Sequence, residues 1–413
     1  MKLFKYRYSG LVILVGLFLA MHLVVIASPH DLVFDEKYYV VDARHIIAGE
    51  GTDRVEHPPL ARLAISSGIL IFGDNPVGWR IMPVMFGAAS LVLLYIICRH
   101  LSLNHRTAFF VTFLLALENL SFIQSGVAML DVFSVTFMLA SFYLYLRGKW
   151  LGSGIFIGLA GLAKLTGFLA LPIIALHWLI TNRTRIPWFA LSLAAAPITY
   201  AALLPLMDWM IWGKFINPIT ETVTMLEVLG ASTFSNLPSE MLSRPWEWLT
   251  QVEIITYWPE PHYLAMLSPT LLILWLPSAI FTGFMLVRKK PWAVFATAWF
   301  AGTYLLWIPA TLVTDRISYI FYLYPAIGTI CLFTGCALIA AEGYLVKSTR
   351  RLWSGVGRVL IPALAVIHLG FFIYLSPLPY WGKLLFGFTI YVVARFYLKT
   401  PTQRNSEQAT LLG

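Results

Sequence analysis

Long apolar runs separated by short polar connections make up most of this chain. Helices of about 20 apolar residues are long enough to cross a bilayer, so the pattern predicts an all-α polytopic membrane protein with about 11–12 transmembrane helices. The first run has no clear small-residue cleavage site, which favours a retained helix over a removed signal peptide. The runs lie near residues 10–28, 77–98, 107–125, 129–146, 151–163, 165–180, 188–207, 268–287, 291–310, 317–340, 359–376 and 384–398.

Two long polar segments, at about 29–75 and 208–267, interrupt this pattern. In the first segment, apolar side chains recur at helical spacing, and glycines at 49 and 51 follow them. This spacing predicts a short amphipathic helix on the membrane surface, ending at the glycines. The apolar stripe consists of Phe34, Tyr38, Val41 and Ile46.

The charges are distributed unevenly between the two sides of the predicted layout. The chain is 59% hydrophobic and 12% charged, with a net charge of +9. If the N-terminus is cytoplasmic, about two thirds of the Lys and Arg residues fall on the inner side, as the positive-inside rule requires. Of the 20 acidic residues, all but Glu342 and Glu407 then fall outside or in outer helix halves. We therefore expect an integral membrane protein with both long segments extracytoplasmic, and the basic residues need no nucleic-acid partner.

Acidic residues gather in the first polar segment. Asp35 and Glu36 follow the first apolar run, and Glu56 and His57 precede two prolines that restrict the backbone. A partly desolvated carboxylate at a membrane interface is suited to act as a general base, whereas the alternative is a solvated loop end. On a helix, Asp35 and Glu36 would lie about 100° apart and face different partners.

Basic residues stand at the outer ends of several runs. Arg62, Arg80, Lys164 and Arg316 form a predicted cationic layer, and Asp131 lies in the same layer. Such a layer suits a phosphate at the depth of the lipid headgroups. The alternatives are a structural Arg80–Asp131 pair, and snorkelling of Lys164 and Arg316 to the headgroups.

Metal binding has weaker support. The outer histidines His30, His45, His57 and His262 lie among acids, but their spacing matches no common metal motif. We therefore expect no metal or other cofactor, with Asp35, Glu56 and His57 as the low-ranked candidate ligands.

These groups favour one reaction class. The outer face of a membrane holds essentially no nucleotide sugars, so a transferase there needs a donor already in the lipid. A polyprenyl-phosphate sugar fits, because its anionic leaving group needs cations while the acceptor hydroxyl needs a base. A transporter would more typically show inverted repeats and charges at mid-membrane, and neither is visible.

Seven short motifs occur in order along the chain: FDE, HPPLARL, WRIMPVMFG, MLDVF, GLAKLTG, SRPWEW and RISYIFYLYP. Together they resemble the protein O-mannosyltransferases, a family of membrane-embedded GT-C glycosyltransferases. The resemblance implies a GT-C-type catalytic transmembrane domain over residues 1–340, followed by C-terminal transmembrane helices and a cytoplasmic tail over 341–413. It also implies transfer of mannose, with inversion, from a polyprenyl- or dolichyl-phosphate carrier to Ser or Thr of exported proteins.

The resemblance leaves the acceptor open. The related lipid A aminoarabinose transferases share the architecture, so a glycolipid or cell-wall glycan is the alternative acceptor. Ala61 replaces the glycine of the family's loop, and the second polar segment has no room for the β-trefoil domain of the eukaryotic enzymes. A prokaryotic cell membrane is therefore the expected location.

Site roles follow from the same resemblance, position by position. Asp35 corresponds to the catalytic acid and Glu36 to its neighbour, so both are predicted catalytic residues. Arg80 and Asp131 correspond to supporting residues of the second and fourth helices, as does Glu56 in the loop. The predicted donor-phosphate residues are His57, Arg62, Lys164, Arg316 and Tyr319.

Overall fold

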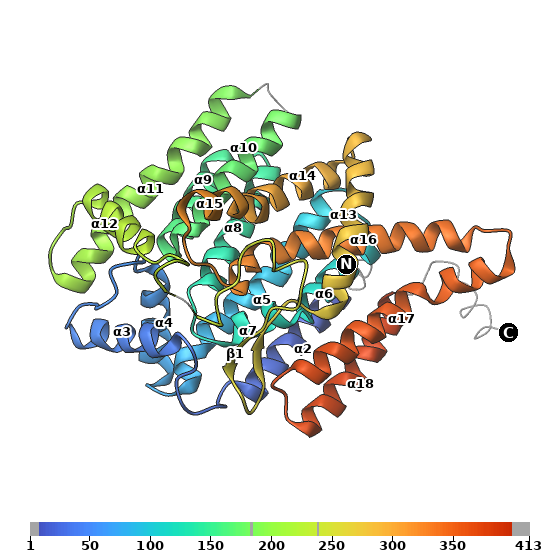
Figure 1. Cartoon of the computed structure of the whole chain (residues 1–413), viewed down its shortest axis with the longest axis horizontal. Coiled ribbons are helices and arrows are strands. Elements are labelled where there is room, and N and C mark those ends of the chain that lie inside the picture. Colours follow the sequence, from blue (N-terminus) through green and yellow to red (C-terminus); the bar gives the residue numbers. More distant parts are fainter. Residues whose placement is uncertain (1–7, 182–184, 238, 399–413) are drawn as a thin grey trace.

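The computed structural model describes residues 8–181, 185–237 and 239–398, and these are overwhelmingly helical (Figure 1). All twelve predicted apolar runs are helical. The helices formed by these runs are α2 (Ser9–Val25), α5 (Pro76–His100), α6 (His105–Ala116), α7 (Asn119–Gly126), α8 (Asp131–Leu146), α9 (Trp150–Ala163), η1 (Leu165–Leu169), α10 (Ala170–Thr181), α11 (Ile186–Trp212), α13 (Pro269–Val287), α14 (Pro291–Phe300), η2 (Ala301–Leu305), α15 (Trp307–Thr314), η3 (Ile320–Leu323), α16 (Tyr324–Val346), α17 (Arg351–Leu375) and α18 (Tyr380–Tyr397). The predicted all-α class of membrane protein is confirmed.

Several runs are broken or short. The run predicted at 107–125 is two helices, α6 and α7, with a bend of 64° between them. Among the described residues, six helices are long and apolar enough to cross a membrane, or seven if α6 and α7 form one span. Apolar helices such as α8 and α9 are shorter, with 16 and 14 residues. These short helices are largely buried in the bundle.

The first polar segment folds into two helices, α3 (Glu36–Ala48) and α4 (Leu60–Phe72). The predicted short helix is confirmed as α3, and it ends at Gly49, whose φ of 74° lies in the left-handed region that glycine tolerates; its location on the membrane surface stays a prediction. The helix α4, which packs between α3 and α5, was not predicted. Its apolar run of 13 residues is too short to indicate a membrane span.

The second polar segment contains α12 (Pro218–Gly230) and a small antiparallel hairpin, neither of which was predicted. The hairpin pairs β1 (Ile255–Trp258) with β2 (Tyr263–Ala265), and Ile255 lies opposite Ala265. It is a local exception to the all-α class.

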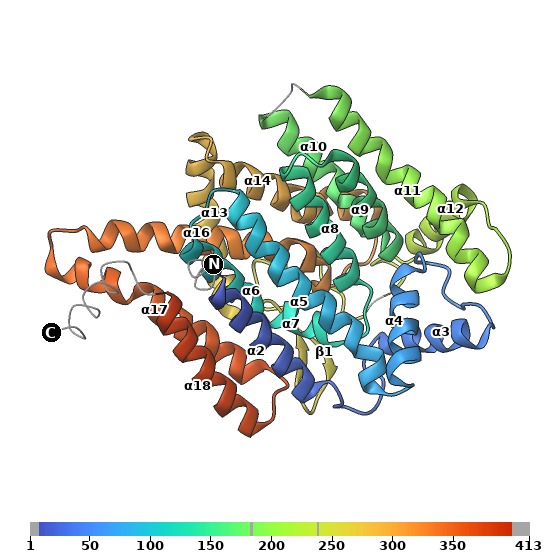
Figure 2. The ribbon, with the colours of Figure 1, turned by 180° about the vertical axis from the view of Figure 1, so that it is seen from behind.

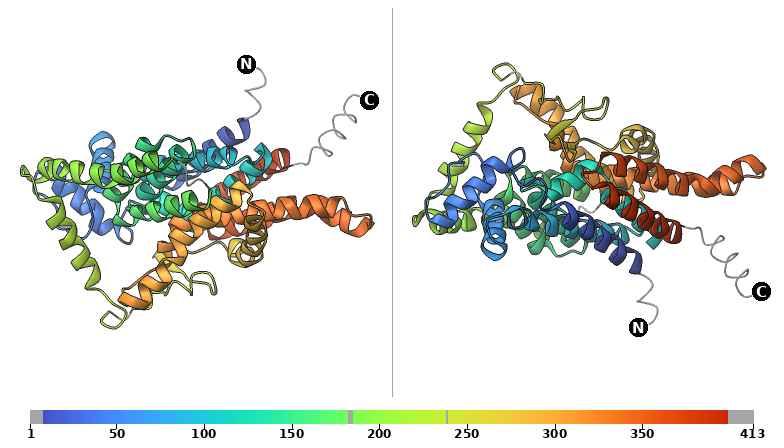
Figure 3. Two further views of the ribbon diagram at one scale, coloured as in Figure 1. Left: turned by 90° about the horizontal axis from the view of Figure 1, so that it is seen from above. Right: turned by 90° about the horizontal axis from the view of Figure 1, so that it is seen from below.

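The helices place the polar segments at one end of the molecule and the described chain ends away from them. α9 packs between α8 and α11, while α17 and α18 form a hairpin that packs on α16 and α2 (Figure 2). The Ser9 hydroxyl lies 2.6 Å from that of Tyr397, so the start of α2 adjoins the end of α18. α3, α4 and α12 lie at the opposite end from α17 (Figure 3).

The predicted division into two domains remains a prediction. Residue 340, the predicted boundary, lies inside α16. Most of the predicted cytoplasmic tail, residues 399–413, and the N-terminal residues 1–7 lie outside the described residues.

Candidate active site

Asp35 lies immediately before α3, at its N-cap position. Its backbone carbonyl accepts hydrogen bonds from the N–H groups of Tyr38 and Tyr39, which begin the helix. Within the described residues, its half-buried carboxylate has no hydrogen bond or ion pair. Burial raises the pKa of Asp35 to about 6, the nearby Lys164 ammonium opposes this rise, and the Asp131 carboxylate adds to it. Asp35 is therefore an accessible carboxylate that is ionised at neutral pH and near its protonation point.

Glu36 is fully buried and faces away from that carboxylate. Its two oxygens accept hydrogen bonds from Nε and Nη2 of Arg80, at 2.9 and 2.8 Å. They also accept the backbone N–H groups of Val33 and Ala128, each at 2.9 Å. The expectation that Asp35 and Glu36 face different partners is confirmed. Because every acceptor direction of Glu36 is used structurally, we assign it a positioning role in place of the predicted catalytic one.

Arg80 completes this buried clamp. Its guanidinium also donates to the carbonyls of Ile26, Pro29 and Asp31, at 3.1, 2.8 and 3.0 Å. The Glu36–Arg80 pair thereby connects four parts of the chain. They are the end of α2, the start of α3, the helix α5 and the segment just before α8. Its effect is to hold the backbone that carries Asp35.

Lys164 and Asp131 form a second buried ion pair. Lys164 occupies the break between α9 and η1, between the apolar runs predicted at 151–163 and 165–180, and Asp131 opens α8. The Lys164 Nζ lies 2.7 and 2.9 Å from the two Asp131 oxygens. It also lies 5.1 Å from the ring centre of Tyr322 and 5.5 Å from that of Phe321. The alternative Arg80–Asp131 pair was wrong, because each residue has a different partner.

Arg62 is used within its own loop. Its Nη1 lies 2.6 Å from both Asp42 Oδ2 and the Arg54 carbonyl, and its Nη2 lies 2.6 Å from the His57 carbonyl. Only 2% of the side chain is exposed. Arg62 therefore fastens the loop before α4 to α3, and its guanidinium faces protein groups where we had expected a phosphate.

This loop holds His57 beside the site. Its ring is buried, Nδ1 has no partner among the described residues, and the ring centre lies 6.4 Å from that of Tyr39. Burial lowers the pKa of His57 well below its ordinary value, and the cations of Lys164, Arg62 and Arg316 lower it further. The imidazole is thus neutral, so it can offer a hydrogen bond but no charge.

Glu56, the neighbour of His57, has a looser setting. Its carboxylate lies 3.5 Å from Nη1 of Arg54, and both side chains are partly exposed. A pair of this kind contributes little to stability, so Glu56 has a supporting position on the loop at most.

Arg316 enters the site from the connection between α15 and η3. The second polar segment holds this connection, since Thr233 forms a β-bridge with Arg316 and the Ser243 N–H donates to the Ser318 carbonyl at 3.0 Å. Within the described residues the Arg316 guanidinium has no carboxylate partner, and its Nε is buried and unbonded. Arg316 is therefore a cation placed near His57 whose charge no protein carboxylate neutralises.

Aromatic rings line the same region, and the sequence analysis identified only Tyr319 among them. Tyr319 stacks on Phe321 with ring centres 5.1 Å apart. Phe34, which precedes Asp35 and has a φ of 46°, stacks on Tyr257 of the hairpin at 4.2 Å. The aromatic density of FDEKYY and SYIFYLYP was the available indication of this wall.

The structure brings together most of the predicted site residues but divides them by role. Asp35, Lys164, Asp131, His57 and Arg316 act on one another electrostatically. Asp35, Glu56 and His57, the predicted candidate metal ligands, do not lie close enough together to share an ion. Within the described chain, the group close enough to share an ion is Asp42, His45 and Asp53, and Asp42 is already paired with Arg62.

Comparison with known proteins identifies relatives of this chain. Residues 43–217 match the model of the dolichyl-phosphate-mannose-protein mannosyltransferase family. A polyprenol-phosphate-mannose–protein mannosyltransferase of Corynebacterium glutamicum is 24% identical over 455 aligned positions, covering 87% of this chain and 85% of the relative. An undecaprenyl phosphate-α-4-amino-4-deoxy-L-arabinose arabinosyl transferase of Pseudomonas aeruginosa is 32% identical over 226 positions, covering 50% of this chain and 40% of the relative.

Among solved structures, the Saccharomyces cerevisiae protein O-mannosyltransferase Pmt1–Pmt2 complex, bound to the sugar donor, superposes with a TM-score of 0.75. The match covers 90% of each chain at 12% sequence identity, so it establishes a shared fold. The resemblance inferred from the motifs is thus confirmed: this chain has the fold of the GT-C membrane glycosyltransferases and is related to the protein O-mannosyltransferase family.

Proposed function

We propose that this protein is a glycosyltransferase that moves a sugar, mannose in the favoured case, from a polyprenyl-phosphate carrier to a hydroxyl acceptor. The observation that carries the proposal is the Asp35 carboxylate. It is accessible, unpaired within the described residues and close to Lys164, and its pKa of about 6 suits a base at neutral pH. A residue held only for structure would instead be paired, as Glu36 is.

The proposed reaction is a single displacement. Asp35 takes the proton of the acceptor hydroxyl while that oxygen bonds to the anomeric carbon. The bond between this carbon and the phosphate oxygen breaks, and the lipid phosphate leaves with the bonding electrons. Because the nucleophile enters opposite the leaving group, the anomeric configuration inverts, as the family resemblance implies.

The leaving phosphate needs positive charge, and we assign this role first to Arg316. Its guanidinium lacks a carboxylate partner within the described chain, so its charge is available for an anion. Lys164 is the second cation. An ammonium has three N–H donors, and Asp131 accepts at most two of them at 2.7 and 2.9 Å, which leaves one for a phosphate oxygen.

Other predicted donor residues receive different roles. Arg62 is removed from the proposed phosphate site because Asp42 neutralises its charge and its Nη donors are used by Asp42 and by loop carbonyls, although its Nε has no partner within the described residues. The neutral His57 and the Tyr319 hydroxyl can contribute hydrogen bonds without adding charge. This division makes the donor site smaller than the cationic layer predicted from the sequence.

For the acceptor, we favour a Ser or Thr hydroxyl of an exported protein, since the name of the Corynebacterium glutamicum relative describes that protein as a mannosyltransferase acting on protein. A glycolipid is the second candidate, favoured by the local 32% identity to the arabinosyl transferase. Incubating the purified protein with radiolabelled polyprenyl-phosphate sugars and membranes distinguishes the two, because the label enters either protein or lipid.

The orientation in the membrane belongs to the same proposal. We place the two polar segments on the extracytoplasmic side and the N-terminus in the cytoplasm. The charge bias supports this placement.

The test of the base is the Asp35→Asn variant, which keeps the shape of the side chain and removes its basicity. We expect turnover to fall by about 10²–10⁴-fold, the range typical of general-base catalysis, with donor binding nearly unchanged. The matched control is Asp31→Asn, an identical change at an exposed position in the same segment. Full activity of Asp35→Asn in correctly inserted protein contradicts the proposed mechanism.

A further inference from the structure

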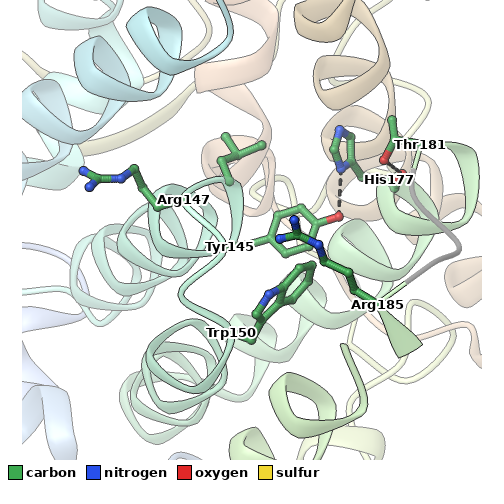
Figure 4. A pocket seen from close by; sticks show the side chains of 8 residues that line it. Tyr145, Arg147, Trp150, His177, Thr181 and Arg185 are labelled. Atoms are coloured by element: carbon green, nitrogen blue, oxygen red, sulfur yellow. Dashed lines mark hydrogen bonds between the residues drawn. The ribbon is translucent and has the colours of Figure 1, made fainter. Parts of the chain in front are cut away.

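A cavity of about 230 Å³ lies at the ends of α8, α9 and α10 that are remote from the candidate active site (Figure 4). Asp131 opens the 16-residue helix α8, and the cavity is lined by Tyr145 and Leu146 at its other end. At 1.5 Å per residue, the two ends of α8 are about 24 Å apart. The cavity therefore lies near the opposite membrane surface from Asp35, and the proposed reaction does not use it.

Unpaired donors converge at the rim of this cavity. The Arg185 guanidinium and the Trp150 indole N–H have no hydrogen-bond or ion-pair partner within the described residues. Both approach one point, since Arg185 Nη1 lies 3.8 Å and Trp150 Nε1 3.9 Å from where a Cβ on Gly148 would be. Gly148 has a φ of 68°, and its missing side chain leaves this point open.

The remaining lining adds polar groups but no negative charge. The Tyr145 hydroxyl lies 2.9 Å from His177 Nδ1, and the Thr181 hydroxyl donates to the His177 carbonyl at 2.7 Å. None of the described lining residues is acidic. Figure 4 shows the Arg185 side chain extending toward Tyr145 and Trp150. A guanidinium and an indole N–H aimed at one open point, with no acid beside them, form a site for an anion.

The surroundings of the cavity favour an anion that carries hydrocarbon chains. Leu151, Ile180 and Ile186 are the sequence neighbours of Trp150, Thr181 and Arg185, and their side chains are 51%, 50% and 62% exposed. At the end of a membrane-spanning bundle, such side chains contact acyl chains while the adjoining cation meets the headgroups. A free phosphate ion would make no use of these apolar side chains.

We propose that this cavity binds the phosphate of an anionic phospholipid from the leaflet opposite the active site, with Arg185 as the principal cation and the Trp150 N–H as a second donor. The acyl chains extend along Leu151, Ile180 and Ile186. The bound lipid lies between the ends of α8, α9, α10 and α11; the other ends of α8 and α9 carry Asp131 and Lys164.

The test measures lipid binding to the purified, delipidated full-length protein by native mass spectrometry. The probes are phosphatidylglycerol, phosphatidylcholine and inorganic phosphate. We expect the wild type to bind phosphatidylglycerol more tightly than the other two. Arg185→Gln should weaken that binding by about tenfold or more, as expected for loss of a charge-assisted contact. Trp150→Phe, which keeps the ring and removes the N–H, should weaken it less.

The matched control is Arg351→Gln, which removes an exposed arginine at the start of α17 that does not line the cavity. It should bind phosphatidylglycerol as the wild type does. Equal weakening in the Arg185 and Arg351 variants would show only a general effect of net charge and would overturn the site. Inorganic phosphate bound as tightly as phosphatidylglycerol would overturn the assignment to a lipid.

Discussion

The sharpest structural prediction concerns Glu36, which the sequence placed in the catalytic centre and the structure places in a buried clamp. Glu36→Gln keeps the volume but removes the charge. The carboxylate now accepts four hydrogen bonds, two from Arg80 and two from backbone N–H groups. The single oxygen of a glutamine cannot accept all four, and its NH₂ group would face donors. Arg80, with 0% of its side chain exposed, would lose its counter-charge.

Breaking a buried ion pair by removing one partner typically costs about 3–5 kcal/mol. We therefore expect Glu36→Gln to lower the apparent midpoint of thermal unfolding in detergent, and to lower activity through displacement of Asp35. The control is Arg44→Gln, which breaks an exposed pair with Asp74 in the same region and should cost about 1 kcal/mol or less. A double variant with Arg80→Met should cost less than the sum of the single changes, since no unpaired charge remains.

Two outcomes would contradict this reasoning. If Glu36→Gln unfolded at the same temperature as the wild type but had lost turnover, Glu36 would have a direct catalytic role. A midpoint and turnover both unchanged would show that the clamp does not hold the segment that carries Asp35.

Further predictions concern the base, the donor site and the topology. Because Asp35 must be ionised to accept a proton and its pKa is about 6, kcat/KM should fall as the pH drops below 6, by about tenfold per unit. Lys164 lowers the pKa of Asp35, so Lys164→Met should move the acidic limb of the pH–rate profile to higher pH. An unchanged limb would show that the Lys164 charge does not act on Asp35. Arg316→Ala should weaken donor binding by about 1.5–3 kcal/mol, measured by titration with the lipid-linked donor. Unchanged affinity would show that Arg316 contacts the lipid headgroups and does not bind the donor. In intact cells an impermeant maleimide should label a cysteine at the exposed Val55 but not one at Thr349, and the reverse pattern would invert the proposed orientation.

The local composition of the chain was enough to predict the helices formed by its long apolar runs, but not the shorter helices α4 and α12. Apolar runs identify helices directly, because a backbone in lipid must satisfy its hydrogen bonds internally. The glycines after Ile46 predicted the end of α3, and the 100° spacing predicted that Asp35 and Glu36 would separate. The ordered motifs predicted the family and the GT-C fold.

Which charges are paired was decided only by the tertiary structure. Arg80 and Lys164 look alike in the sequence, each a cation at the end of an apolar run. One meets Glu36, 44 residues away, and the other meets Asp131, 33 residues away. A buried charge takes whichever counter-charge the packing of helices brings within hydrogen-bond distance, and sequence separation carries no information about that distance. Only the fold therefore shows that, among the residues the structure describes, Asp35 and Arg316 have no ion-pair partner, and the proposed chemistry rests on this.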